Sequence, residues 1–67
     1  MSDRLQQTNQ REKFLKIYAN LPLSARREII LVLEEQPLTW EVAYLEIKND
    51  TEKSKSILQK LETLGII

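Results

Sequence analysis

The sequence predicts a mainly α fold of three to four short helices in one small domain. Apolar residues recur at spacings of three and four in residues 11–20, 39–48 and 51–64, which is the period of one helical face. The only glycine, Gly65, directly follows the last of these segments, where helices commonly end on a residue with positive φ. A chain of 67 residues suffices for one domain, which we place at residues 10–67 behind a polar, flexible N-terminus at residues 1–9.

The first predicted helix covers residues 11–20. Phe14, Ile17 and Tyr18 form its apolar face, and charged residues occupy the other positions. Pro22 ends it, because proline disfavours helical backbone in the residue before it.

Residues 24–36 carry two competing patterns. Residues 29–33 are five apolar residues in a row, and a run this short fits either a buried helix or a buried strand. The thirteen residues from Ser24, a good N-cap type, to the residue before Pro37 favour a helix by their length, whereas the β-branched residues in the run favour a strand. We favour the helix. The alternative is an α+β fold with a strand at residues 28–33, which forms a hairpin turning at residues 34–37 or pairs with its copy across a dimer.

Residues 39–48 also fit both the period of a helix and the alternation of a strand. Trp40, Ala43, Tyr44 and Ile47 share one helical face, while residues 38–44 alternate between apolar and polar as a strand would. Residues 45–47 break the alternation, so we favour a helix. We expect Trp40 and Tyr44 to belong to the core.

The last helix has a clear end and an open start. Residues 49–51 are all good N-cap types, and the sequence does not choose among them. At the other end, we expect Gly65 to take positive φ and Ile66 to fold back onto Leu61, as in a Schellman motif.

The composition excludes several classes of chemistry. Without cysteine or histidine, the chain cannot form a disulfide, a Cys/His zinc site, a Ser-His-Asp triad or a thiol nucleophile. A single glycine leaves no phosphate-binding loop. We therefore expect no enzyme activity, cofactor, metal or small-molecule substrate. Arg26 and Arg27 could form an anion site, but near a helix start we favour a solvated pair. The polar N-terminus has no apolar run that could cross a membrane, so we expect a cytoplasmic protein.

One order of elements resembles a known class of domain. An apolar helix at residues 28–33 would be followed by residues 37–39, a short helix with a central Ala43, a polar turn, and a second helix ending in Leu-Glu-Thr-Leu-Gly-Ile-Ile at residues 61–67. Over residues 24–67 this resembles winged-helix and related helix-turn-helix DNA-binding domains, here without a wing. Residues 39–49 also resemble a segment shared by a group of short uncharacterised proteins, a likeness that implies no activity.

The resemblance implies a DNA-binding transcriptional regulator. The recognition helix would be residues 51–64, in which lysines contact phosphates and Ser or Gln reach base edges. The expected contacts are Lys48, Asn49, Thr51, Lys53, Lys55, Ser56, Gln59 and Lys60. This hypothesis requires that Lys53, Lys55 and Lys60 share one face. The net charge of zero favours instead a solvated face that binds no nucleic acid.

The alternative function is a homodimeric protein–protein interaction module without a nucleic-acid role. A chain this small commonly gains stability from a partner subunit, so we expect a homodimer under either function. The expected dimer surface uses the apolar residues Ile29, Leu31, Leu33, Trp40, Ile66 and Ile67.

Overall fold

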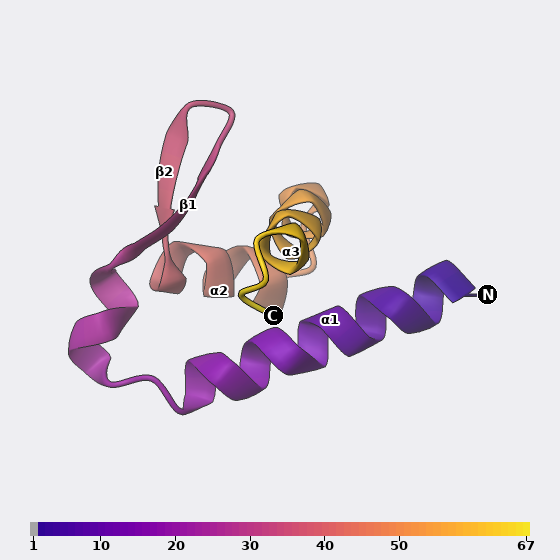
Figure 1. Cartoon of the computed structure of the whole chain (residues 1–67), viewed down its shortest axis with the longest axis horizontal. Helices are drawn as coiled ribbons and strands as arrows, with labels where there is room; N and C mark the ends of the chain where they lie inside the picture. The colour runs from indigo at the N-terminus through magenta and orange to yellow at the C-terminus, as the bar shows by residue number, and fades with distance from the viewer. Residues whose placement is uncertain (1) are drawn as a thin grey trace.

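The computed structural model describes the backbone of residues 2–67 and the side chains of residues 9–67. Three α-helices and a two-stranded antiparallel hairpin make up the described part of the chain (Figure 1). In chain order the elements are α1 (Ser2–Ala19), a 3₁₀ turn η1 (Leu23–Arg27), β1 (Ile29–Leu33), β2 (Gln36–Thr39), α2 (Trp40–Lys48) and α3 (Glu52–Thr63). The fold is therefore mainly α with a small β-hairpin. None of the described helices has the length and hydropathy needed to span a bilayer.

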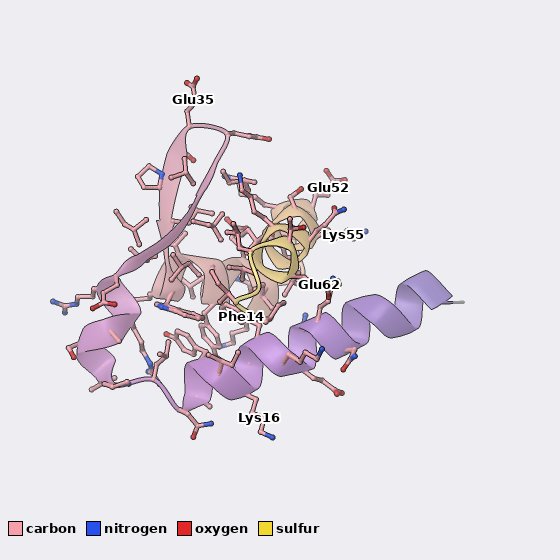
Figure 2. All side chains as sticks on the ribbon, in the orientation of Figure 1. Phe14, Lys16, Glu35, Glu52, Lys55 and Glu62 are labelled. Carbon is pink, nitrogen blue, oxygen red and sulfur yellow. The ribbon has the colours of Figure 1, made fainter. Side chains whose placement is uncertain are left out.

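The core lies where the three helices meet the base of the hairpin. Phe14 from α1, Ile47 from α2, and Ile57 and Leu61 from α3 are its largest fully buried side chains. Figure 2 shows Phe14 pointing into this core, while Lys16 points to the opposite side of α1. The N-terminal half of α1 projects beyond the other elements (Figure 1).

The helix predicted over residues 11–20 is confirmed, and α1 starts earlier, at Ser2. Among its described side chains, Phe14 and Tyr18 are buried and Ile17 is half-buried, as the spacing predicted. Met1 and the side chains of residues 2–8 lie outside the described part of the chain, so the flexible N-terminus at residues 1–9 stays a prediction.

The helix predicted over residues 24–36 is wrong, and the alternative with a strand and a hairpin is confirmed. Glu34 and Glu35 form the turn with φ of 51° and 67°, which is the backbone of a two-residue type I′ connection. The inward-facing Leu31 and Leu38 pair across the hairpin and are buried in the core. Burial of this cross-strand pair against the helices favours the strand over the helix that the segment's length suggested.

The helix predicted over residues 39–48 is confirmed as α2. Thr39 caps it, since its hydroxyl accepts a hydrogen bond from the Val42 amide at 3.2 Å. Trp40 and Tyr44 are half-buried and pack against the core, as expected.

The ends of α3 follow the rules for helix termini. Among the three candidate residues, Thr51 is the N-cap, and its hydroxyl accepts a hydrogen bond from the Ser54 amide at 3.2 Å. Gly65 has φ of 77°, and its amide donates to the Glu62 carbonyl at 3.0 Å. The Ile66 amide donates to the Leu61 carbonyl at 2.9 Å, which completes the predicted Schellman motif.

Candidate functional site

The three lysines of the predicted recognition helix do not share one face. Successive helical residues are rotated by about 100°, so Lys53 and Lys60 lie about 20° apart, whereas Lys55 lies about 160° from Lys53. The exposed Ser56 and Gln59 lie between the two groups, and the buried face, which includes Ile57 and Leu61, lies on the other side of the helix. The Lys60 flank faces the hairpin, where its ammonium donates to the Val32 carbonyl at 3.0 Å.

The other residues predicted to bind nucleic acid are also divided. Thr51 is half-buried, and its hydroxyl donates to the Glu46 carboxylate at 2.6 Å, so it is already used inside the fold. Lys48 and Asn49 lie at the C-terminal end of α2, and both are exposed. The exposed Ser56 and Gln59 line a shallow groove along α3 together with Lys60 and Thr63. Glu52 lies on the exposed side of the same helix, as does Lys55 (Figure 2).

The predicted dimer surface is largely occupied by the fold itself. Leu31 is only 4% exposed, so its assignment to a dimer surface is wrong: it lies in the core. Four more of these residues are half-buried and pack against the core cluster: Leu33, Trp40, Ile66 and Ile67. Ile29 is the one member of the set that is exposed, at 61%.

An apolar surface does exist on the side of the hairpin away from the helices. Residues alternate between the two faces of a strand, so Pro37 and Thr39 lie opposite the inward Leu38. Val32 pairs with Pro37 and Ile29 pairs with Thr39, which places both apolar side chains on this outward side. We call Ile29, Val32 and Pro37 the outer hairpin face.

Both edges of the hairpin are protected against a further strand. At the β1 edge the Lys60 ammonium donates a hydrogen bond to the Val32 carbonyl. In β2, Pro37 lacks the backbone N–H that could donate to another strand. The outer hairpin face is thus open while the edges of the sheet are guarded.

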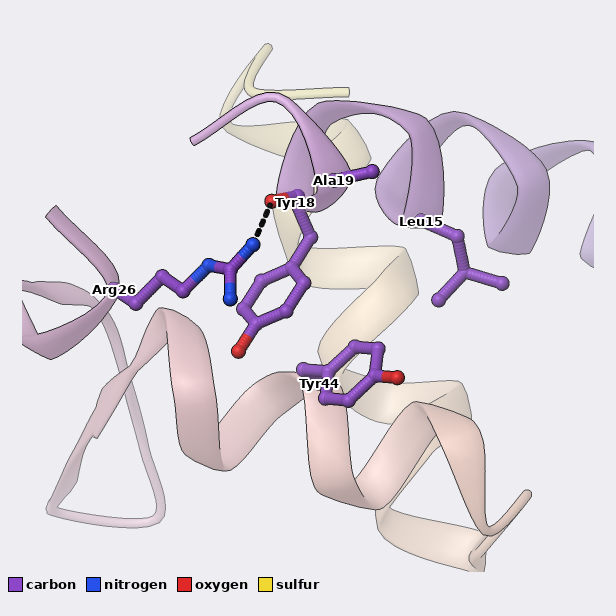
Figure 3. A pocket seen from close by; sticks show the side chains of 5 residues that line it. All are labelled: Leu15, Tyr18, Ala19, Arg26 and Tyr44. Atoms are coloured by element: carbon purple, nitrogen blue, oxygen red, sulfur yellow. Dashed lines mark hydrogen bonds between the residues drawn. The ribbon is translucent and has the colours of Figure 1, made fainter. Parts of the chain in front are cut away.

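A second open feature is a recess of about 550 Å³ between α1, η1 and α2 (Figure 3). It is lined by Leu15, Tyr18, Ala19, Arg26 and Tyr44. The Tyr18 and Tyr44 rings stack with centroids 4.2 Å apart and planes inclined by 6°. The Arg26 guanidinium lies over the Tyr18 ring, 4.4 Å from its centroid, and its Nη2 donates to the Tyr18 carbonyl at 3.4 Å. Figure 3 shows the Tyr18 ring between Arg26 and Tyr44.

The charge at this recess is not compensated. Among the described side chains the only ion pair joins Arg11 and Asp50, at 4.0 Å, so Arg26 has no carboxylate partner there. The Arg26 Nε is buried and has no hydrogen-bond partner. On the α2 side, the Lys48 ammonium lies 5.9 Å from the Tyr44 ring centroid. The expectation that Arg26 belongs to a solvated pair is therefore wrong, because its guanidinium is partly buried against α1.

The described residues contain no cluster of three or more side chains that could hold a metal ion. Comparisons with protein-family models, curated proteins and solved structures found no match to this chain.

Proposed function

We propose that this chain is a non-enzymatic interaction module that forms a homodimer through its outer hairpin face. The observation that carries the proposal is the character of that face. A sheet with one face packed on its core ordinarily presents polar residues on the other. Here Ile29 is 61% exposed and Val32 is 51% exposed, and Pro37 lies opposite Val32.

The geometry favours packing of two faces over pairing of two strands. Lys60 and Pro37 block hydrogen bonding of a further strand at the edges, so a second copy can bind more easily by packing on the apolar face. A two-fold axis would set the face of one copy against the same face of the other, which is the commonest closed arrangement of identical chains. Complete burial of an Ile or Val side chain contributes about 1.5–3 kcal/mol, and four such side chains would meet across the axis.

Sedimentation velocity of the full chain, extending into the millimolar range, tests the proposal. The unmodified chain is expected to shift from monomer to dimer as the concentration rises, and Ile29→Lys or Val32→Lys is expected to keep it monomeric. Leu45→Lys is the matched control, since Leu45 is 49% exposed but lies on α2. A chain that stays monomeric throughout, or a control that disrupts the dimer as strongly as Ile29→Lys, would count against the proposal.

A DNA-binding regulator of helix-turn-helix type is the second candidate, and only in a reduced form, because the single face shared by Lys53, Lys55 and Lys60 that the hypothesis required is absent. It is supported by the tight packing of α2 and α3 across a three-residue connection, residues 49–51. On α3, Lys53, Ser56 and Gln59 lie within about 120° of one another and could meet a duplex together.

Fluorescence anisotropy with labelled duplex DNA at low and moderate salt tests this candidate. Binding is expected to weaken steeply with salt, and Lys53→Glu is expected to reduce it more than Lys55→Glu, which makes the same charge change on the other flank. Absence of binding at low salt removes the candidate.

A further inference from the structure

We propose that the recess between α1, η1 and α2 binds an acidic segment of a partner protein. A carboxylate of that segment would meet Arg26, and an apolar side chain beside it would rest on Leu15 and Tyr44. This surface is separate from the outer hairpin face, so the inference does not depend on the homodimer.

Arg26 supplies the first argument. A guanidinium has five N–H donors in a planar fork that matches a carboxylate. Among the described residues, only the bond from its Nη2 to the Tyr18 carbonyl uses them; the unpartnered Nε is buried, so the Nη groups are the ones that a carboxylate can meet. The Tyr18 ring holds the group flat at 4.4 Å, so little freedom is lost when a ligand binds.

The charge around the recess supplies the second argument. Arg26 and Lys48 stand on either side of the stacked tyrosines, and neither forms an ion pair with a carboxylate in the described structure. Arg11 is engaged elsewhere, donating to the Ile47 carbonyl at 2.7 Å. Arg26 and Lys48, neither of which has a carboxylate partner in the described structure, therefore complement a ligand of negative charge.

The lining supplies the third argument. Leu15 and Tyr44 are half-buried, so each keeps apolar surface open to the recess. Tyrosine and arginine are the residue types that concentrate binding energy at protein interfaces. Two cations around an apolar floor fit a peptide with one apolar residue between acids better than a nucleic acid, which needs a continuous basic track.

The test is an NMR titration of the full ¹⁵N-labelled chain with a panel of capped five-residue peptides. Each peptide carries leucine, phenylalanine or tryptophan between glutamates, and a matched set carries lysine in place of glutamate. At least one acidic peptide is expected to shift the Arg26 Nε–H signal and the amides around Tyr18 and Tyr44 in a saturable way. The lysine peptides are expected to leave these signals unchanged.

Variants assign the effect to the recess. Arg26→Gln is expected to weaken peptide binding about tenfold or more, because a hydrogen bond to a charged group is lost. Arg27→Gln removes the same charge from an exposed neighbour and is expected to change affinity by less than about twofold. Because Arg26 also contacts the end of α1, Lys48→Gln provides a second variant at an exposed position, and it too is expected to weaken binding.

Three results would overturn the inference. The first is that no acidic peptide shifts the recess signals, and the second is that Arg26→Gln and Arg27→Gln behave alike. The third is that the recess signals move with protein concentration alone and Glu35→Lys abolishes the movement, since the occupant is then the hairpin tip of a second copy. Sedimentation of the Arg26→Gln chain separates this inference from the proposed homodimer, which that variant is expected to leave intact.

Discussion

The Lys60 side chain of α3 donates a hydrogen bond to the Val32 carbonyl of β1 at 3.0 Å, so a helix lysine closes the outer edge of the hairpin. Val32 also contributes its side chain to the outer hairpin face. Val32 thus belongs to both features: its carbonyl lies at the guarded edge of the sheet, and its side chain lies on the open apolar face.

Lys60→Met is expected to expose that edge. The cost in the free energy of unfolding is small, about 1 kcal/mol or less, because the bond is exposed. The larger expected effect is faster aggregation, measured by turbidity on mild heating, because an unpaired carbonyl beside an apolar face can accept another strand. Lys53→Met changes the same residue type on the same flank without touching the hairpin, and equal aggregation of both variants would refute the guarding role.

Substitutions in the hairpin turn are expected to stabilise the protein. Glu34 and Glu35 both have positive φ, a backbone that costs ordinary side chains about 1 kcal/mol or more each. The double change Glu34→Asn and Glu35→Gly provides the residues that a type I′ turn prefers and is expected to raise the free energy of unfolding by about 1 kcal/mol. Urea denaturation measures it, and a loss of stability would contradict the assigned turn.

The start of α3 is expected to depend on one of its three candidate caps. Thr51→Ala removes the acceptor for the Ser54 amide and the donor to Glu46, and should cost about 1 kcal/mol or somewhat more in the free energy of unfolding. Asn49→Ala, two residues earlier, is the control and should stay within about 0.5 kcal/mol. Equal losses in urea denaturation would be inconsistent with Thr51 as the N-cap.

Gly65 is expected to resist substitution because of its backbone alone. No atom lies within 4 Å of the position that a Cβ would occupy, while φ is 77°. Gly65→Ala should therefore cost about 1 kcal/mol in the free energy of unfolding, whereas D-alanine, introduced by chemical synthesis, should cost almost nothing. A comparable loss with both would mean that the positive φ is not what limits this position.

The helices could be predicted from sequence because their signals are local. The spacing of Phe14 and Tyr18, the face that includes Ala43 and Ile47, and the glycine at position 65 each report on a few neighbouring residues. The hairpin could be given only as the less favoured alternative, because Ile29–Leu33 fits both periods and the turn residues Glu34 and Glu35 are not the Asn or Gly that mark such turns. Only the tertiary burial of Leu31 and Leu38 decides for the strand.

Of the candidate recess, only an anion site at Arg26 and Arg27 could be considered from sequence. Tyr18, Arg26 and Tyr44 come from three elements, and nothing in their spacing shows that α1 and α2 bring the two rings within 4.2 Å. The prediction of one basic face on α3 is wrong for a simpler reason: the rotation of about 100° per residue separates Lys55 from Lys53 and Lys60. That geometry was available from the residue numbers once the segment was accepted as a helix.

The tilted contact between Phe14 and Trp40, with ring centroids 5.7 Å apart, gives the molecule a built-in optical reporter. Trp40 is the only tryptophan, and in this contact it senses α1, whose buried side chains are Phe14 and Tyr18. Detachment of α1 would wet the indole while α2, α3 and the hairpin still hold one another. Its emission would then shift to longer wavelengths while the part of the helical circular dichroism signal that comes from α2 and α3 remains, so intrinsic fluorescence follows the docking of α1 rather than the unfolding of the whole chain.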